Sequence, residues 1–246
     1  MPIYLDPIPH IYHDTDRPKM KFTSVTTVLG KYHEPFDEMF FSEKVAIREG
    51  KTQQQVLAEW KKGNDDANIY GTMVHEILER YLLAPYRMYS PRDDFESRLL
   101  ISFAQLCLEN NLNIGKSSTM HPERIMSLAF NDNQGLCGTS DIIEDIPNNE
   151  FNVWDFKSNK DFRFESKYGK WLLFPVNHLN DSQFSTYSLQ LSIYGVMYER
   201  ETGKRCNRLG MMYWEKISET WALHNTPYLK KDAENIIDHY KLKMII

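Results

Sequence analysis

The sequence is poor in the residues and runs that define several classes of protein. Its 246 residues include three cysteines, Cys107, Cys137 and Cys206, which are far apart and form no C-x-x-C pair. This pattern argues against structural zinc and against an iron–sulfur cluster held by four cysteines, and it fits a reducing compartment. No apolar run reaches the roughly 18 residues that span a membrane, and the N-terminal stretch lacks an apolar signal core. We therefore expect a cytoplasmic protein with no membrane partner.

Motifs for nucleotide binding and for serine hydrolysis are missing as well. The chain has no G-x-x-x-x-G-K-[ST] loop, no G-x-S-x-G elbow and no glycine-rich dinucleotide fingerprint. Its net charge of −5 does not single out a nucleic-acid binder, but it does not exclude one, because a local basic stripe can hold phosphates. One such stripe, for which a solvated basic loop is the alternative, comprises Lys157, Lys160, Arg163, Lys167 and Lys170.

Hydrophobic periodicity and turn residues predict a single α/β domain with a mixed sheet. An N-terminal hairpin is predicted from two strand-like segments, Ile11–His13 and Lys21–Thr23, on either side of the polar turn DTDRP. Helical patterns follow at residues 36–49, 53–62, 71–83 and 95–109. Thr52 and Gln55 have the spacing of a capping box at the start of the second of these helices.

The second half of the chain alternates predicted strands and helices. Strands are expected at residues 124–131, 136–144, 151–156, 209–214 and 220–224, and helices at 184–200 and 232–240. The helix at 184–200 is apolar on more than one side, which indicates burial between layers. Within the single domain we distinguish an N-terminal elaboration (1–70), a core (71–215) and a C-terminal strand and helix (216–246).

The stretch from Gly138 to Ser158 carries the chemically most informative pattern in the chain. Asp141 ends one predicted strand, and Asp155 stands two residues before Lys157 in the next. Because strand residues i and i+2 share a face, Asp155 and Lys157 point the same way, and a neighbouring strand would bring Asp141 beside them. Two carboxylates and a lysine suit a divalent metal and a water that attacks phosphorus. For an isolated D-x-K triplet, a strand-end salt bridge is the more common interpretation.

Residues outside this stretch fit the same centre. Glu123 stands just before the first core strand, within reach of the acids, although alone it would be a solvated surface residue. His75 and Glu79 share one face of an amphipathic helix, and their string HEILE lacks the second histidine of a zinc protease. Gln190 and Tyr194 also share a helix face, where glutamine can bind phosphate and tyrosine can stack on a base. The structural alternative is a core tyrosine beside a surface glutamine.

Taken in order, these features resemble the PD-(D/E)xK nuclease superfamily and, within it, the RecB-type nuclease domain. The matching strings are GTMVH ending at His75, GTSD ending at Asp141, DFK beginning at Asp155 and QLSIY beginning at Gln190, with Glu123 between the first two. The resemblance spans roughly residues 10 to 215 and is nearest to small phage-type exonucleases and to mitochondrial genome maintenance exonucleases. The literal Pro-Asp pair is absent, as are the cluster-binding cysteines and the helicase portion of some relatives.

The resemblance implies a restriction-endonuclease-like core of order α-β-β-β-α-β, with an N-terminal hairpin and extra helices. It implies metal ligation by His75, Asp141, Asp155 and the backbone carbonyl of Phe156, with Glu123 as a further acid. It also makes Lys157 the catalytic lysine. The residues for which it suggests substrate contacts are Gln190, Tyr194, Ser24, Thr26, Lys160 and Arg163. The implied cofactor is one or two Mg²⁺ or Mn²⁺ ions, and no iron–sulfur cluster is expected.

The activity implied is hydrolysis of DNA phosphodiester bonds from a single-stranded end, with a 5′-phosphate on the product. The setting would be replication, recombination or repair in a bacterial or phage-infected cell, with replication or recombination proteins as further partners. Two alternatives remain open: a structure-specific or restriction-type endonuclease of the same fold, and a DNA-binding subunit without catalysis.

Overall fold

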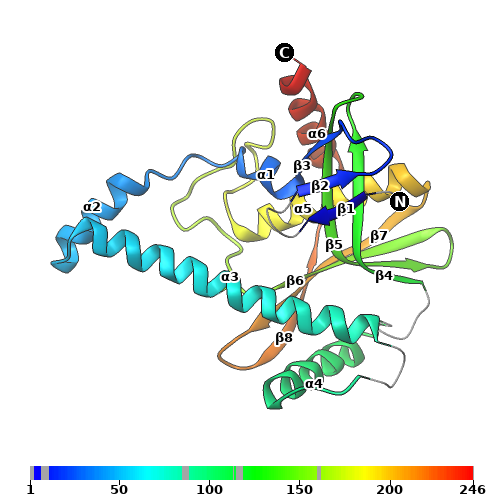
Figure 1. Cartoon of the computed structure of the whole chain (residues 1–246), viewed down its shortest axis with the longest axis horizontal. Helices are drawn as coiled ribbons and strands as arrows, with labels where there is room; N and C mark the ends of the chain where they lie inside the picture. Colours follow the sequence, from blue (N-terminus) through cyan, green and yellow to red (C-terminus); the bar gives the residue numbers. More distant parts are fainter. Residues whose placement is uncertain are drawn as a thin grey trace.

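The computed structural model describes residues 3–6, 11–84, 89–112, 114, 119–159 and 162–245 of the chain. A β-sheet carries helices on both faces, and a helical arm projects from one side (Figure 1). The strands are β1 (Ile3–Asp6), β2 (Ile11–Asp14), β3 (Lys21–Ser24), β4 (Met120–Ala129), β5 (Gln134–Ile146), β6 (Glu150–Lys157), β7 (Arg205–Glu215) and β8 (Thr220–Thr226). The helices are α1 (Val25–Gly30), α2 (Glu38–Glu49), α3 (Gln53–Leu83), α4 (Asp94–Glu109), α5 (Gln183–Thr202) and α6 (Lys230–Ile245).

The sheet is built around β5. One edge of β5 pairs antiparallel with β4, while the other edge pairs parallel with β3 at its start and antiparallel with β6 at its end. Beyond β6 the sheet continues with β7, which is parallel to β6, and then with the antiparallel β8. The predicted α/β class is therefore confirmed, with a mixed central sheet flanked by helices and the order helix, three strands, helix, strand.

Each face of the sheet has its own hydrophobic core. Ile143 and Val153 pack with residues of α1, α5 and α6, whereas their neighbours Ile142 and Trp154 pack with residues of α3 and α4. This alternation follows from the two-residue period of a strand, so a sheet covered on both faces reads as a nearly continuous apolar run. As predicted, α5 is buried along most of its length between the sheet and α6.

The two helices predicted at residues 53–62 and 71–83 are in fact one, the 31-residue α3. The capping box of Thr52 and Gln55 is present at its start. Gly63 and Gly71 lie inside the helix, and each costs about 1 kcal/mol relative to alanine, which is too little to break a helix that packs against α2 at one end and α4 and the sheet at the other. Gly71 therefore does not begin a helix, contrary to our expectation.

The N-terminal hairpin exists, but its predicted pairing is wrong. β2 pairs antiparallel with β1 rather than with the segment at Lys21–Thr23. That segment is β3, which joins the main sheet parallel to β5, with Phe22 opposite Gly135. The turn between β2 and β3 is held by the Asp14 carboxylate, which accepts hydrogen bonds from the backbone N–H groups of Asp16 and Arg17. This turn redirects the chain from the small sheet into the large one.

No helix in the described part of the chain has both the length and the apolar character that a membrane crossing needs. The division into an elaboration, a core and a C-terminal segment stays a prediction, as does the cytoplasmic location.

Candidate metal centre

Three neighbouring strands bring acidic residues together at one point of the sheet. The register of β4 and β5 pairs Pro122 with Ile142 and Arg124 with Ser140, so Glu123 lies opposite Asp141. On the other side of β5, the pair Ile142–Trp154 continues toward Asp155. Asp141 on the middle strand therefore has an acid on each side, which is the convergence expected from strand alternation.

A histidine from the helical layer completes this group. His75 on α3 places its Nδ1 atom 3.3 Å from Oδ1 of Asp141. The nearest potential ligand atoms of His75, Glu123 and Asp141 all lie within 4.8 Å of one another. The other carboxylate oxygen of Asp141 accepts a hydrogen bond of 2.5 Å from the backbone N–H of Phe156. Asp141 is thereby fixed with one oxygen toward the histidine, to which it is directly paired.

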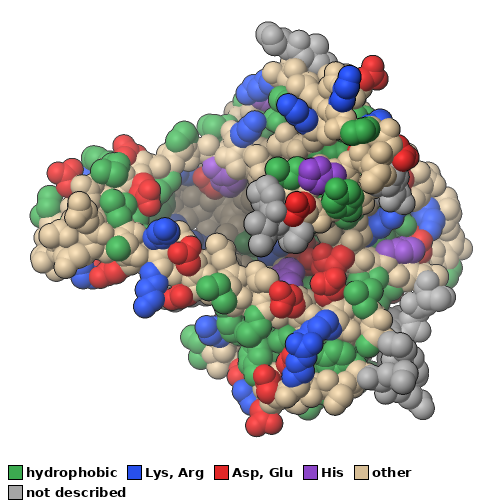
Figure 2. All heavy atoms as spheres, viewed as in Figure 1, with side chains coloured by type: hydrophobic (Ala, Val, Ile, Leu, Met, Phe, Trp, Pro, Cys, Tyr) green, Lys and Arg blue, Asp and Glu red, His purple; other side chains and the backbone are tan. Residues whose placement is uncertain are grey.

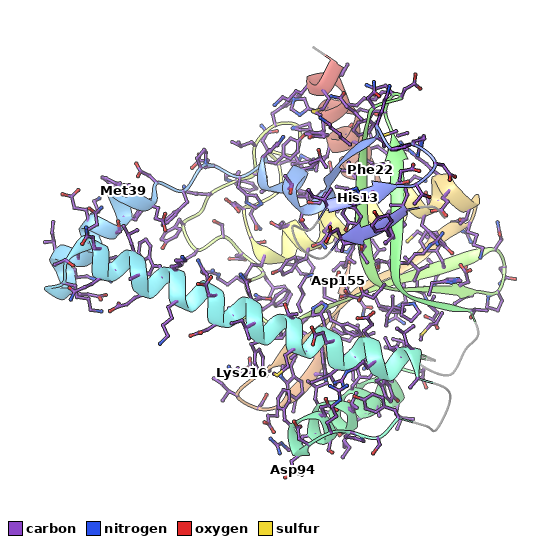
Figure 3. The ribbon with its side chains drawn as sticks, in the orientation of Figure 1. His13, Phe22, Met39, Asp94, Asp155 and Lys216 are labelled. Atoms are coloured by element: carbon purple, nitrogen blue, oxygen red, sulfur yellow. The ribbon has the colours of Figure 1, made fainter. Side chains whose placement is uncertain are left out.

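Asp155 lies beside this trio and is paired with the lysine two residues later. It is 3 % exposed, and its carboxylate forms an ion pair with Nζ of Lys157. The Lys157 ammonium also lies 4.8 Å from the centre of the Tyr187 ring. Figure 3 shows Asp155 between the sheet and α3. The two residues share a strand face as predicted, and Lys157 lines the cavity at this centre.

The charges at this centre are unbalanced. Burial and the nearby charges of Asp141 and Glu79 raise the pKa of Glu123 to about 8. Burial, together with Asp141, likewise raises the pKa of Asp155 to about 6, although Lys157 opposes this shift. Burial alone would lower the pKa of His75, but the charge and hydrogen bonding of Asp141 raise it to about 9. Carboxyl groups that hold protons this strongly indicate a place where added positive charge would be stabilising.

The donor set at this point fits a divalent cation. It offers carboxylate oxygens and one imidazole nitrogen, on strands and a helix whose positions are fixed by the core. A cation would also compensate the carboxyl groups whose pKa is raised. His75, Glu123 and Asp141 would hold it. The carboxylate of Asp155 is instead paired with Lys157, and its role as a metal ligand stays a prediction.

A cavity of about 680 Å³ opens above these residues, between α3 and the ends of β4 and β6. Its walls include His75, Glu79, Glu123, Phe156 and Lys157. Tyr187 also lines it, a position that was not predicted from the sequence. The missed signal was a second Q-x-x-x-Y string, Gln183 to Tyr187, which precedes the first by seven residues and so faces the same side of the helix.

Gln190 and Tyr194 occupy the core rather than the cavity. They are 7 % and 3 % exposed, and Nε2 of Gln190 donates a 3.1 Å hydrogen bond to the Tyr194 hydroxyl. Tyr194 packs so closely on β5 that a Cβ atom added at Gly138 would lie 2.6 Å from its ring. In this structure the pair supports the strand that carries Asp141. The substrate contact we expected for it stays a prediction.

The other residues expected to touch substrate are more scattered. Ser24 caps the N-terminus of α1, where its hydroxyl accepts a hydrogen bond from the N–H of Thr27 and lies 3.1 Å from the Thr26 hydroxyl. Among the described residues that line the cavity at the metal centre, neither Ser24 nor Thr26 occurs. Arg163 lines a separate pocket that shares Tyr187 with this cavity. Lys160 lies outside the described residues.

Comparisons with known proteins add the following findings. No protein-family model and no curated protein matches this chain. Among solved structures, the chain is similar to a protein from Eubacterium rectale named as a candidate exonuclease, with 14 % identity and a TM-score of 0.40 over 88 % of this chain and 69 % of that one. It is also similar to the protein SSO0001, with 17 % identity and a TM-score of 0.29 over 60 % of each chain.

Proposed function

We propose that this protein is a divalent-metal-dependent nuclease that hydrolyses phosphodiester bonds of DNA. The observation that carries the proposal is the convergence of His75, Glu123 and Asp141 beside the Asp155–Lys157 pair, at the floor of an open cavity. Metal-dependent hydrolysis of a phosphodiester needs ligands for the cation and is favoured by a positive group near the phosphate, and this centre offers residues for both. We propose Mg²⁺ or Mn²⁺ as the cation, because carboxylate oxygens predominate among the ligands.

Each residue of the centre has a distinct task in this proposal. When bound, the cation would neutralise the scissile phosphate and lower the pKa of a water. The Phe156 N–H fixes Asp141, so that one carboxylate oxygen stays directed toward His75. Lys157 keeps its proton because the buried Asp155 and Asp141 raise its pKa despite its own burial. Its ammonium is thus available to orient the attacking water or to stabilise negative charge that develops on the phosphate.

We further propose that the enzyme acts from a free single-stranded end. The arm formed by α2 and α3 projects from the body, and the face of the molecule is hollowed above α3, between the arm and the body (Figure 2). The cavity at the metal centre lies along α3, next to Ala67, Gly71 and His75. A strand that follows α3 would therefore reach the acids. A single strand is flexible enough for such a path, whereas a duplex is stiff.

The experiment that tests the function is a short time course with DNA labelled separately at its 5′ and 3′ ends. Single- and double-stranded forms should be incubated with Mg²⁺, with Mn²⁺ and with a chelator. We expect metal-dependent loss of one label before the other, and that first product gives the polarity. Binding of DNA without cleavage in either metal would instead identify a catalytically inactive DNA-binding subunit. If the protein neither binds nor cleaves DNA under any of these conditions, the proposal is overturned.

A further inference from the structure

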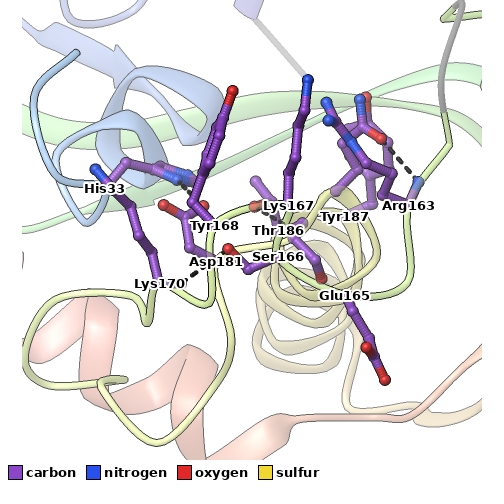
Figure 4. Close-up of a pocket in the computed structure, with 12 residues that line it drawn as sticks. His33, Arg163, Glu165, Ser166, Lys167, Tyr168, Lys170, Asp181, Thr186 and Tyr187 are labelled. Carbon is purple, nitrogen blue, oxygen red and sulfur yellow. Dashed lines mark hydrogen bonds and ion pairs between the residues drawn. The ribbon is translucent and has the colours of Figure 1, made fainter. Parts of the chain in front are cut away.

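A second pocket, of about 340 Å³, lies beside the cavity of the metal centre. Its walls come from the loop at residues 163–170 and from the first turns of α5, and it contains Arg163, Lys167 and Lys170 (Figure 4). We propose that this basic pocket is a phosphate subsite for the same nucleic-acid strand that the metal centre cleaves. The inference rests on the proposed function, and it assigns the basic pocket to a phosphate near the scissile bond of the same strand.

The position of the basic pocket supports this assignment. Tyr187 is common to the basic pocket and to the cavity of the metal centre. One side of its ring faces the Lys157 ammonium at 4.8 Å, and its hydroxyl donates a 3.4 Å hydrogen bond to the side chain of Asn159. The two hollows therefore meet at this side chain. A strand with one phosphate at the acids would continue past Tyr187 and bring a further phosphate to the basic pocket.

The charges of the basic pocket favour an anion. Lys170 is paired with Glu34 at 2.8 Å, and His33 with Asp181 at 2.8 Å. Arg163 and Lys167, in contrast, form no ion pair with an acid in the described part of the chain. Figure 4 shows their side chains extending to one side of the loop, while the one remaining acid, Glu165, points the other way. Within the described part of the chain, two positive groups that no acid neutralises therefore face the same space, and Lys167 has only the Tyr168 ring, 5.5 Å from its ammonium, beside it.

The loop that carries these groups is anchored at both ends. The backbone N–H of Arg163 donates to Oε1 of Gln183 at 2.8 Å, and its carbonyl accepts from the N–H of Phe184 at 3.1 Å. At the far end, the N–H of Asp181 donates to the carbonyl of Lys170 at 2.8 Å. A solvated basic loop needs no such anchors. Holding the cations in place beforehand lowers the entropic cost of binding a phosphate.

The ligand we infer is a phosphodiester of a single strand. Each contact between a cation and a phosphate of single-stranded DNA contributes about −0.7 to the slope of log affinity against log salt concentration. The double variant Arg163→Ala, Lys167→Ala should therefore lose about 1.4 of that slope, and its dissociation constant should rise on the order of tenfold at moderate salt. Both side chains are exposed, so the variant should fold normally.

The matched control is Arg200→Ala, Lys231→Ala, which removes the same charge. Arg200 is exposed near the other end of α5, roughly 25 Å from Gln183 at 1.5 Å per residue, and Lys231 is exposed on α6. Binding of labelled single-stranded DNA to the full chain should be measured in a chelator, where no cleavage occurs. We expect the wild-type slope for the control. An unchanged slope in the pocket variant, or an equal loss in the control, overturns the subsite.

Neutral linkages identify which phosphate occupies the basic pocket. In a set of strands, one phosphate at a time is replaced by an uncharged methylphosphonate. The wild type should lose affinity when the phosphate that occupies the basic pocket is made neutral, whereas the Arg163→Ala, Lys167→Ala variant should bind that strand and the unmodified strand equally. If both proteins show the same dependence of affinity on the position of the neutral linkage, the subsite is contradicted. Metal-dependent cleavage by the wild type keeps the proposed function in place if the subsite fails. A wild type that neither binds nor cleaves removes both proposals.

Discussion

Glu123 is the residue whose backbone shows most directly that this centre is assembled under constraint. It has a φ of 47°, in the left-handed region that a glutamate rarely adopts. Such a conformation costs of order 1–3 kcal/mol and persists only where the surroundings enforce it. Here the regular pairs on both sides of Glu123 hold β4 to β5 while its carboxyl group stays beside Asp141. Stability is given up at the point where three strands present their acids.

Removing either member of the Asp155–Lys157 pair should abolish cleavage and leave the fold intact. Asp155→Ala deletes an acid at the centre, and Lys157→Ala deletes the ammonium that we propose to stabilise charge on the phosphate, so each should lower kcat by on the order of 100-fold or more. Cleavage of labelled DNA measures the first effect, and circular dichroism measures the fold. Full activity in either purified variant would show that the centre is not catalytic. Arg200→Ala serves as a surface control and should cleave normally.

The site residues whose positions could be predicted are those that a short hairpin or the regular alternation of a strand brings together. Asp155 and Lys157 share a face by strand alternation, and the hairpin that joins β5 to β6 brings Asp141 to them. Tyr187 was not predicted, because two Q-x-x-x-Y strings on one helix face are equivalent by periodicity. Only the packing of α5 under the sheet decides that Tyr194 is buried and Tyr187 is not.

At the scale of elements, α3 is the helix whose continuity the local pattern hides. Its glycines suggested an end and a new start, yet the helix runs from the tip of the arm to the metal centre. Tertiary packing offsets the low helix propensity of these glycines, because the second half of α3 buries Val74, Ile77 and Leu78 against α4 and the sheet. Tertiary contacts of this kind cannot be read from a local window. The same limit explains β3, whose partner β5 lies more than a hundred residues away.

Gly63 provides a test of the continuous helix. A Cβ added there meets nothing within 4 Å, and the residue is exposed inside α3. Gly63→Ala should therefore stabilise the protein by about 1 kcal/mol and raise Tm by about 2–4 °C. Gly50 has equally open space but a φ of 65° at the end of α2, so Gly50→Ala should destabilise by about 1 kcal/mol. Thermal unfolding of both variants checks the prediction, and a loss of stability in Gly63→Ala contradicts a continuous α3.

Glu96 joins α4 to α3 and should make this junction acid-sensitive. Burial raises its pKa, but hydrogen bonds from the Arg92 N–H, from Arg80 and from the Tyr89 hydroxyl outweigh burial and lower it. Because the folded state binds the proton less readily than the unfolded state, this contribution is complete above pH 4.5, the ordinary pKa of the group, and is lost as the pH falls through the lowered pKa. Glu96→Gln should cost about 3 kcal/mol at neutral pH.

The measurement is chemical unfolding of the wild type and of Glu96→Gln at several pH values. The two free energies of unfolding should converge as the pH falls below 4.5, because the wild type then loses its charged partner for Arg80. Glu76→Gln on the exposed face of α3 is the matched control and should show no such convergence. A constant difference between the wild type and Glu96→Gln across the range would mean that the carboxylate charge is not what stabilises the junction.

At the scale of the whole molecule, the proposed entry of a strand end depends on the projecting arm formed by α2 and α3. Metal ligands alone do not distinguish an enzyme that needs an end from one that cuts anywhere. The hollow above α3 leads along the helix toward the acids, and the basic pocket lies on the other side of Tyr187. The helices that make the arm were recognisable in the sequence. Their arrangement around a hollow could not be predicted, because it depends on how the far end of α3 packs against α4 and the sheet.

This arrangement predicts that cleavage requires an end that can be threaded past α3. Linear single-stranded DNA should be degraded, whereas a circular strand of the same sequence should resist over the same time course. A biotin at one end, bound by streptavidin, should block degradation from that end only, because the bulky protein cannot follow the strand along the hollow. The unbound biotinylated strand is the control and should be degraded normally. Equal cutting of the circle would favour an endonuclease, whose substrate enters the cavity from the side without passing the arm.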